Sequence, residues 1–321
     1  MKTHTLAGSG LQVSAMCLGA MTLGGVQDKQ TSFAILDRFV EAGGTFVDTA
    51  NAYMFWLDGG TGDESENLLG AWMAERGNRD DLVLATKVGR RPTVFGGGLP
   101  YSEPLTAPRI AAQLDASLAR LGTDRVDVYW THRDDRDTPQ EETVGALAEA
   151  VTAGKALALG ASNHTPWRVE RARALADAAG GARYTLMQNR YSYLQPRPDA
   201  PLASQGHVHA TSDTVDYAGG TDDMALLTYS ALLNGSYVRP DKPLEDVYDH
   251  PGTASRLKAL DEVASQTGAT RNQVVLAWLT GLGGPTIPLV AVSSIRQLDE
   301  AISGMDLVLD ADQHRRLTEA A

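Results

Sequence analysis

The chain has 321 residues, of which 43% are hydrophobic, and its formal net charge is −12. This length suits an α/β barrel folded as one domain over residues 1–321, and the negative charge argues against nucleic acid or an anionic membrane as a partner. The single cysteine, Cys17, excludes an internal disulfide and any metal cluster built from cysteines.

The chain begins with a predicted β-hairpin. Its strands are residues 2–6 and 11–13, and the glycines of the intervening 7–10 allow the tight turn between them. An apolar stretch follows at 13–26, but polar residues interrupt the approach to it and no convincing cleavage site follows. We therefore expect a cytoplasmic protein. No run in the sequence approaches the ~20 apolar residues of a membrane span.

After the hairpin, short apolar runs alternate with helix-like stretches. The runs, interpreted as eight strands, are residues 16–21, 45–49, 82–87, 126–130, 156–161, 185–188, 225–229 and 289–292. Among the helices predicted between them are residues 31–42, 64–75, 108–121, 139–153 and 166–178. Prolines begin three of these helices, and a glycine follows each of the five. The alternation predicts a parallel sheet, most simply a (β/α)8 TIM barrel with an N-terminal β-hairpin.

An open doubly wound sheet is the structural alternative. Residues 8–10, Gly-Ser-Gly, begin like a dinucleotide-binding fingerprint. The third glycine of that fingerprint is missing, however, and no helix follows the segment. The barrel is therefore the favoured fold.

Four polar residues fall at or just past the ends of the second, third and fourth predicted strands. They are Asp48, Tyr53, Lys87 and His132. Because catalytic residues of such barrels lie at the carboxyl ends of the strands, we expect the four to share one site. A tyrosine hydroxyl titrates near ~10 and needs a nearby cation to deliver a proton at neutral pH. Lys87 could supply that cation, itself held by Asp48.

Several segments, in this order, resemble motifs of the aldo-keto reductase family. They are residues 9–14, 18–22, 46–50, 64–70, 117–129 with His132, 160–163 and 188–192. Any one of them would be weak evidence. Their order and spacing over nearly the whole chain argue against chance similarity.

The resemblance implies an NAD(P)H-dependent enzyme that reduces a small-molecule aldehyde or ketone. Tyr53 would donate the proton as hydride reaches the carbonyl carbon, and Lys87 would lower the pKa of Tyr53. Asp48 would hold Lys87, and His132 would hydrogen-bond the carbonyl oxygen. The alternative is a cofactor-binding regulatory subunit with the same fold and little turnover, as in the potassium-channel-associated members of the family.

The resemblance also implies a set of cofactor-binding residues. The nicotinamide side would be bound by Gly19, Ala20, Met21, Ser162, Asn163, Gln188 and Tyr229, the last stacked on the ring. The phosphate side would be bound by Ser230, Ala231, Leu232, Ala291, Ser293, Ser294, Arg296, Gln297 and Glu300. Ala291 stands where the family often has glycine, and no lysine stands nearby to pair with a 2′-phosphate. NADPH is the predicted cofactor, with NADH as the alternative.

The sequence contains fewer indications of how the substrate is bound. Phe55, Trp56 and Trp130 flank the four polar residues and could form an apolar wall. His207 and His209 suggest a metal site at first, but nothing nearby completes a ligand set. A solvated loop is the better interpretation of these two histidines, and no metal is expected.

Overall fold

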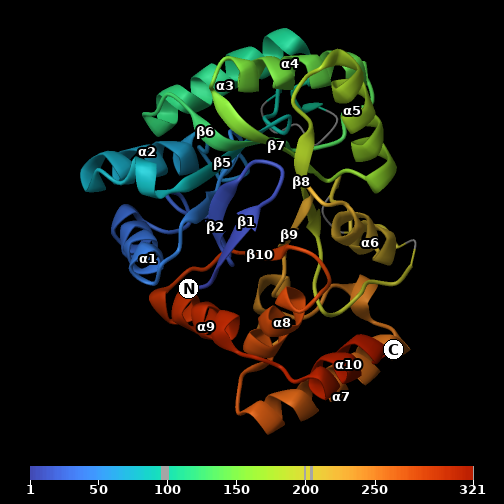
Figure 1. Cartoon of the computed structure of the whole chain (residues 1–321). Coiled ribbons are helices and arrows are strands. Elements are labelled where there is room, and N and C mark those ends of the chain that lie inside the picture. Colours follow the sequence, from blue (N-terminus) through green and yellow to red (C-terminus); the bar gives the residue numbers. More distant parts are fainter. Residues whose placement is uncertain (95–100, 199, 203–204, 321) are drawn as a thin grey trace.

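A closed barrel of eight parallel strands forms the centre of the protein (Figure 1). The computed structural model describes residues 1–94, 101–198, 200–202 and 205–320. Around the barrel the strand order is β10-β3-β4-β5-β6-β7-β8-β9. The barrel strands are β3 (Cys17–Gly19), β4 (Phe46–Asp48), β5 (Val83–Val88), β6 (Val126–Thr131), β7 (Ala156–Ser162), β8 (Tyr184–Arg190), β9 (Ala225–Tyr229) and β10 (Thr286–Val290). The predicted TIM barrel is confirmed.

The predicted N-terminal hairpin is confirmed as well. β1 (Thr3–Leu6) pairs antiparallel with β2 (Leu11–Ser14), and Gly10 takes a left-handed φ of 73° in the turn between them. Leu6 and Val13 pack with the side chains that fill the barrel interior, among them Phe46. The hairpin therefore closes the end of the barrel at which the strands begin.

Helices surround the barrel on its outside (Figure 1). They are α1 (Lys29–Glu41), α2 (Glu64–Arg76), α3 (Ala107–Leu121), α4 (Gln140–Thr152), α5 (Pro166–Ala179), α6 (Ser212–Gly220), α7 (Pro251–Thr267), α8 (Arg271–Thr280), α9 (Ile295–Asp306) and α10 (Ala311–Glu319), with short 3-10 turns at η1 (Arg79–Asp81), η3 (Leu233–Gly235) and η4 (Asp246–Tyr248). The five helices named from the sequence end close to their predicted bounds. Gly77, Gly122 and Gly180 cap three of them with φ near 65°, a conformation that costs glycine little.

The prediction for the last strand is wrong in position. It starts at Thr286 and ends at Val290, whereas the apolar pattern placed it at 289–292. The strand therefore includes Pro288, although proline is rare inside a central strand because it cannot donate a ladder hydrogen bond. In the barrel Pro288 nevertheless lies in register with Thr228 of β9, and Leu289 lies in register with Cys17 of β3.

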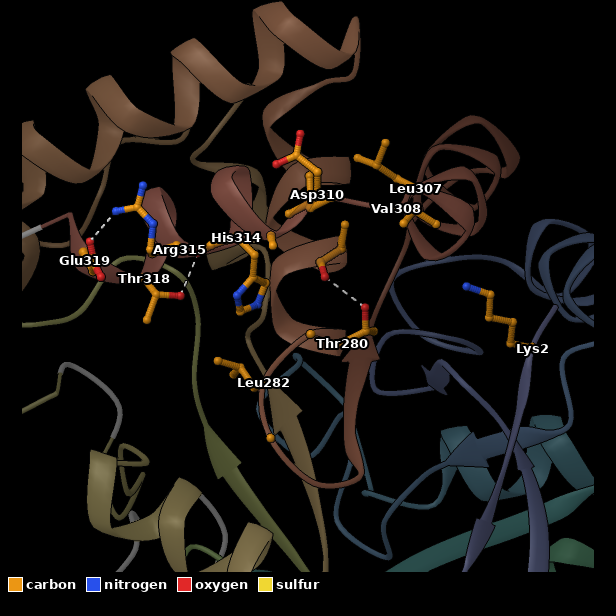
Figure 2. A pocket seen from close by; sticks show the side chains of 15 residues that line it. Lys2, Thr280, Leu282, Leu307, Val308, Asp310, His314, Arg315, Thr318 and Glu319 are labelled. Carbon is orange, nitrogen blue, oxygen red and sulfur yellow. Dashed lines mark hydrogen bonds and ion pairs between the residues drawn. The ribbon is translucent and has the colours of Figure 1, made fainter.

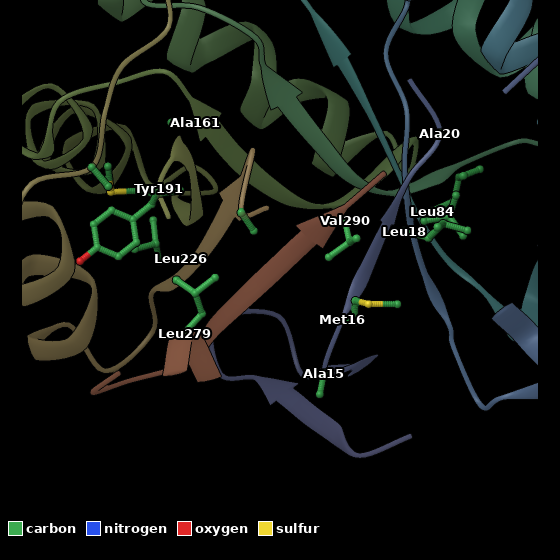
Figure 3. Packing of buried hydrophobic residues seen from close by; sticks show 14 of the residues in the cluster. Ala15, Met16, Leu18, Ala20, Leu84, Ala161, Tyr191, Leu226, Leu279 and Val290 are labelled. Carbon is green, nitrogen blue, oxygen red and sulfur yellow. The ribbon is translucent and has the colours of Figure 1, made fainter. Parts of the chain in front are cut away.

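Two groups of buried apolar side chains stabilise the barrel, one on each side of the sheet. Successive strand residues point to opposite faces, so Leu18 packs outward under the helices while Cys17 packs inward. Figure 3 shows the outward group, with Leu84, Leu226 and Val290 from three further strands. The buried thiol of Cys17 is free.

Trp130 belongs to the inward group, so the expectation that it forms a wall of the substrate site is wrong. Its side chain is fully buried inside the barrel. A β-carbon on Gly160 of the neighbouring strand β7 would lie 2.1 Å from the Trp130 ring. The absence of a side chain at Gly160 is therefore what leaves room for the indole.

Gly160→Ala should destabilise the fold because the fully buried indole cannot move aside without repacking the barrel. Overpacking of this kind costs about 1–3 kcal/mol. Chemical denaturation of the variant measures the change in the free energy of unfolding. Gly145→Ala in α4 is the matched control, because among the described residues no atom outside the local backbone of α4 lies within 4 Å of its added β-carbon. That substitution should stabilise the helix by up to ~1 kcal/mol. Equal effects of the two substitutions would contradict the packing argument.

Candidate active site

The four polar residues singled out from the sequence lie together at the carboxyl ends of adjacent strands. Asp48 ends β4, Lys87 is the next-to-last residue of β5, and His132 directly follows β6. Tyr53 lies in the loop after β4. The backbone N–H of His132 donates to the carbonyl of Val88 at 2.8 Å, which extends the pairing of β5 and β6 past the end of β6. A parallel barrel brings these positions to one end because all its strands run the same way.

Lys87 connects two members of this group, Asp48 and Tyr53. Its ammonium group is fully buried and donates to the carboxylate of Asp48, to the backbone carbonyl of Thr49 at 2.7 Å and to the hydroxyl of Tyr53 at 2.9 Å. A lysine ammonium has three N–H donors, and all three are used here. The Tyr53 hydroxyl therefore faces a fixed positive charge.

The protonation states follow from burial and from this charge. Burial works to lower the pKa of Lys87, but the neighbouring Asp48 and Tyr53 outweigh it and the pKa is raised, so the ammonium stays charged. Burial raises the pKa of Tyr53, and Lys87 offsets only part of that rise. The net pKa of Tyr53 thus lies above its ordinary value, and the hydroxyl holds its proton at neutral pH.

His132 is a neutral ring beside Tyr53. The two ring centroids are 5.8 Å apart with an interplanar angle of 82°. Burial, followed by the charges of Lys87 and Arg90, lowers the pKa of His132 well below its ordinary value. A neutral imidazole carries one N–H donor and one acceptor nitrogen. His132 can therefore donate a hydrogen bond to a carbonyl oxygen without adding a charge to the site.

Three polar side chains predicted to bind the nicotinamide carboxamide form a connected chain at the ends of β7 and β8. Ser162 donates to the Oε1 atom of Gln188 at 3.2 Å and accepts from Nδ2 of Asn163 at 3.1 Å. Gln188 also donates to Asp48 at 3.3 Å, which ties this chain to the Lys87 group. Asn163 has a left-handed φ of 62°. Asparagine is among the few side chains that adopt this conformation readily.

The amide of Asn163 has no free bonding capacity. Its Nδ2 atom also donates to the backbone carbonyl of His132 at 3.0 Å. Its Oδ1 atom accepts from the hydroxyl of Tyr229 at 2.6 Å and from the N–H of Val208 at 3.1 Å. Gln188 keeps one N–H and one acceptor position unused within the described residues, so a carboxamide fits Gln188 directly. At Asn163 it would have to replace Tyr229 or Val208.

The other predicted cofactor residues lie on three neighbouring strand ends. Tyr229 to Leu232 end or follow β9, Ala291 to Glu300 follow β10, and Gly19 to Met21 end or follow β3; these strands are adjacent in the barrel. The side chains of Ser294 and Gln297 are engaged in capping α9, where Ser294 accepts from the N–H of Gln297 at 3.3 Å. Arg296 is exposed on the first turn of that helix. A cation at a helix N-terminus fits an anionic phosphate.

Two residues near this site were missed by the sequence interpretation. His207, expected in a solvated loop, is half-buried with its ring edge on Tyr229 at a centroid distance of 5.2 Å. Burial and the charge of Arg90 lower the pKa of His207 to about 3, so the ring is neutral. Arg90 lies three positions after Lys87 in the sequence, and this spacing was the only feature of the sequence that could have indicated its place near the site. Among the described residues no three metal-ligating side chains come together.

Two surface hollows lie at the opposite end of the barrel from these residues. One has a volume of about 690 Å³ and is lined by the loop before β10 and the segment 307–319 (Figure 2). The other, about 520 Å³, is lined by residues at the start of β7 and β8 and by Gly8 of the hairpin turn. Neither contains any of the four polar residues. Among the described residues, no helix has the length and apolar character to cross a membrane.

Comparison with known proteins gives one family. The model of the Aldo/keto reductase family matches residues 15–321. Norsolorinic acid reductase stcV of Emericella nidulans is 31% identical over 95% of this chain and 77% of its own length. The uncharacterized oxidoreductase YrpG of Bacillus subtilis is 29% identical over 99% of this chain and 95% of its own. Aryl-alcohol dehydrogenase [NADP(+)] of Phanerodontia chrysosporium is 28% identical over 97% of this chain and 83% of its own length.

Proposed function

The chain belongs to the aldo/keto reductase family, and from this premise we propose that it reduces an aldehyde or ketone to an alcohol with NADPH, NADH being the alternative cofactor. The observation that supports this most is the contact of the Lys87 ammonium group with Asp48, Thr49 and the Tyr53 hydroxyl. Through this contact the Tyr53 hydroxyl lies beside a buried cation, at the end of the barrel where catalytic residues lie in this fold, which supports a role in proton transfer.

In this proposal Tyr53 is the proton donor. The bound cofactor supplies hydride to the carbonyl carbon. Tyr53 gives its proton to the carbonyl oxygen, and Lys87 stabilises the tyrosinate that remains. The raised pKa of Tyr53 suits this direction because the hydroxyl is protonated when the substrate arrives. His132 donates a hydrogen bond to the same oxygen and orients it, and Asp48 keeps Lys87 charged and in place.

An aromatic carbonyl compound is the proposed substrate class. Trp56 is 48% exposed and lies edge-on to Tyr53, with ring centroids 6.4 Å apart, and Phe55 lies edge-on to Trp56 at 5.4 Å. Aromatic side chains next to the proton donor offer an edge-to-face surface for another ring. One related protein is named for aryl alcohols, which supports an aromatic panel as the first choice.

The test is the oxidation of NADPH followed at 340 nm across a panel of aryl aldehydes, alkyl aldehydes and ketones. A reductase turns over at least one class at a rate above the cofactor's own decay. A regulatory subunit would bind NADPH, seen by fluorescence titration, and reduce none of the panel. That second outcome would favour the alternative function over the enzyme.

NADPH should bind more tightly than NADH because Arg296 and the N-terminus of α9 attract a 2′-phosphate. Added salt should narrow this difference by screening the exposed charge. Arg296→Met should weaken NADPH binding by about tenfold, as expected for one hydrogen bond to a charged group, and leave NADH unaffected. Fluorescence titration gives both affinities. Arg315→Met, which removes an exposed arginine of α10 paired with Asp312, is the control. Equal affinities of the wild type for the two cofactors would remove Arg296 from this role.

A further inference from the structure

The side chain of Arg90 reaches across the mouth of the barrel. It lies two positions past the end of β5. Its Nη2 atom donates to the backbone carbonyl of Gly206 at 2.7 Å, in the segment that follows β8. Strands β6 and β7 separate β5 from β8 in the barrel. A side chain that joins the ends of β5 and β8 therefore passes over the carboxyl end of the barrel, where the Lys87 group lies.

The base of Arg90 is held firmly on both sides. The N–H of Gly89 donates to the buried carboxylate of Glu103 at 2.8 Å, and the carbonyl of Gly89 accepts from Arg133 at 2.8 Å. On the other side Arg91 forms an ion pair with Asp63 at 2.6 Å. The backbone that presents Arg90 is thus fixed by contacts that do not use the Arg90 side chain.

Among the described residues, Arg90 has no carboxylate partner, unlike its neighbours. Arg91 pairs with Asp63, and Arg133 pairs with Asp135 at 3.3 Å. In the part of the chain that the structure describes, Arg90 forms no ion pair, and its hydrogen bonds all come from Nη2. Its Nε atom is buried there without an acceptor. Arg90 as a whole is half-buried, and a partly desolvated guanidinium group is costly unless it is paired, so an anion at this position would complete its hydrogen bonding.

The surroundings leave this positive charge unbalanced. Asp48 forms an ion pair with Lys87, and the rings of His132 and His207 are neutral because burial lowers their pKa values. The charge of Arg90 reaches Tyr53 as well. A chain of net charge −12 thus has a locally positive mouth, and such a field attracts an anionic substrate from solution.

We propose that Arg90 binds a carboxylate of the substrate, so that the preferred substrates are carbonyl compounds that also carry a carboxylate at the end of the molecule remote from the reacting carbonyl. The planar guanidinium matches a carboxylate in a two-point hydrogen-bonded pair. The inference rests on the reductase function proposed above, because it places the carbonyl at Tyr53 and His132. It goes beyond that function by specifying that the preferred substrate is negatively charged.

Two substrates with the same aldehyde test the proposal: 4-formylbenzoate, which carries a carboxylate, and its methyl ester, in which that group is neutral. The wild type should have the higher kcat/KM for the acid. Arg90→Met should reduce the acid-to-ester ratio of kcat/KM by about 10- to 100-fold, as expected from the loss of a hydrogen-bonded charge pair. Arg90→Lys, which keeps the charge, should recover part of the ratio. Arg136→Met removes an exposed arginine, paired with Asp134, from a loop at the same end and should keep the wild-type ratio.

A binding measurement separates the failure of this inference from the failure of the reductase function. Calorimetric titration of benzoate into the protein with NADP⁺ should show binding that Arg90→Met weakens at least tenfold. If no carbonyl compound of the panel is reduced, these two aldehydes included, the reductase function fails while the titration still decides the role of Arg90. The inference would be overturned if Arg90→Met changed kcat/KM equally for the acid and the ester and left benzoate binding unchanged. Loss of NADPH affinity without a change in the acid-to-ester ratio would overturn it too and assign Arg90 to a cofactor phosphate.

Discussion

Tyr53→Phe is expected to abolish most carbonyl reduction while the cofactor still binds. The substitution removes only the hydroxyl, and general acid catalysis by such a group contributes about 10²- to 10⁴-fold to the rate. The one hydrogen bond lost is the 2.9 Å contact with Lys87, which retains Asp48 and Thr49 as acceptors. The fall should therefore appear in kcat, measured as NADPH oxidation at saturating aldehyde, with little change in the NADPH affinity measured by fluorescence.

Tyr217→Phe is the matched control for this loss. The Tyr217 hydroxyl also donates to a charged partner, Glu170 at 2.7 Å, but it lies on α6, outside the Lys87 group. That variant should keep the wild-type rate. If the Tyr53→Phe protein, folded by circular dichroism, turned over a simple aldehyde as fast as the wild type, Tyr53 could not be the proton donor.

Lys87→Met should lower the rate by about 100-fold, because removing one preorganised polar group costs the transition state ~3 kcal/mol. The charge of Lys87 lowers the pKa of Tyr53, so its loss should raise that pKa further. Reduction needs Tyr53 protonated, so the rate falls as the pH rises through this pKa. The alkaline limb of the pH–rate profile should therefore move to higher pH in the variant. A folded variant with the wild-type rate and profile would contradict the proposed role of Lys87.

The structure adds a stability effect to the same substitution. Asp48 is fully buried and paired with Lys87, and removing one partner of such a pair typically costs 3–5 kcal/mol because a buried charge is left alone. The double variant Asp48→Asn, Lys87→Met replaces that charge by a neutral amide of similar shape. It should recover a large part of the lost stability in chemical denaturation and none of the lost rate. Recovery of the rate along with the stability would mean that Lys87 only supports the fold.

The sequence was enough to predict the barrel because each feature that indicates its strands and helices is local. Apolar runs bounded by glycine, proline and helix-like periods mark strands and helices without knowledge of distant contacts. The predicted bounds of the last strand were wrong for the same reason: the local apolar run 289–292 leaves out Thr286 to Pro288, whose pairing with β9 only the tertiary structure reveals. The prediction for Trp130 was wrong because a strand buried on both faces shows no alternation of polar and apolar residues. The sequence of such a strand does not tell which side chains fill the barrel.

By itself the sequence determined the fold and the grouping of Asp48, Tyr53, Lys87 and His132, because parallel strands bring all their carboxyl ends to one end of a barrel. Tertiary structure alone decided how these groups are charged. Burial outweighs Lys87 at the Tyr53 hydroxyl, and burial depends on packing from the whole chain. It also decided the surroundings of Arg90, whose partner Gly206 lies 116 positions away in sequence. Contacts across that separation depend on how the loops close over the barrel, which no local pattern of residues encodes.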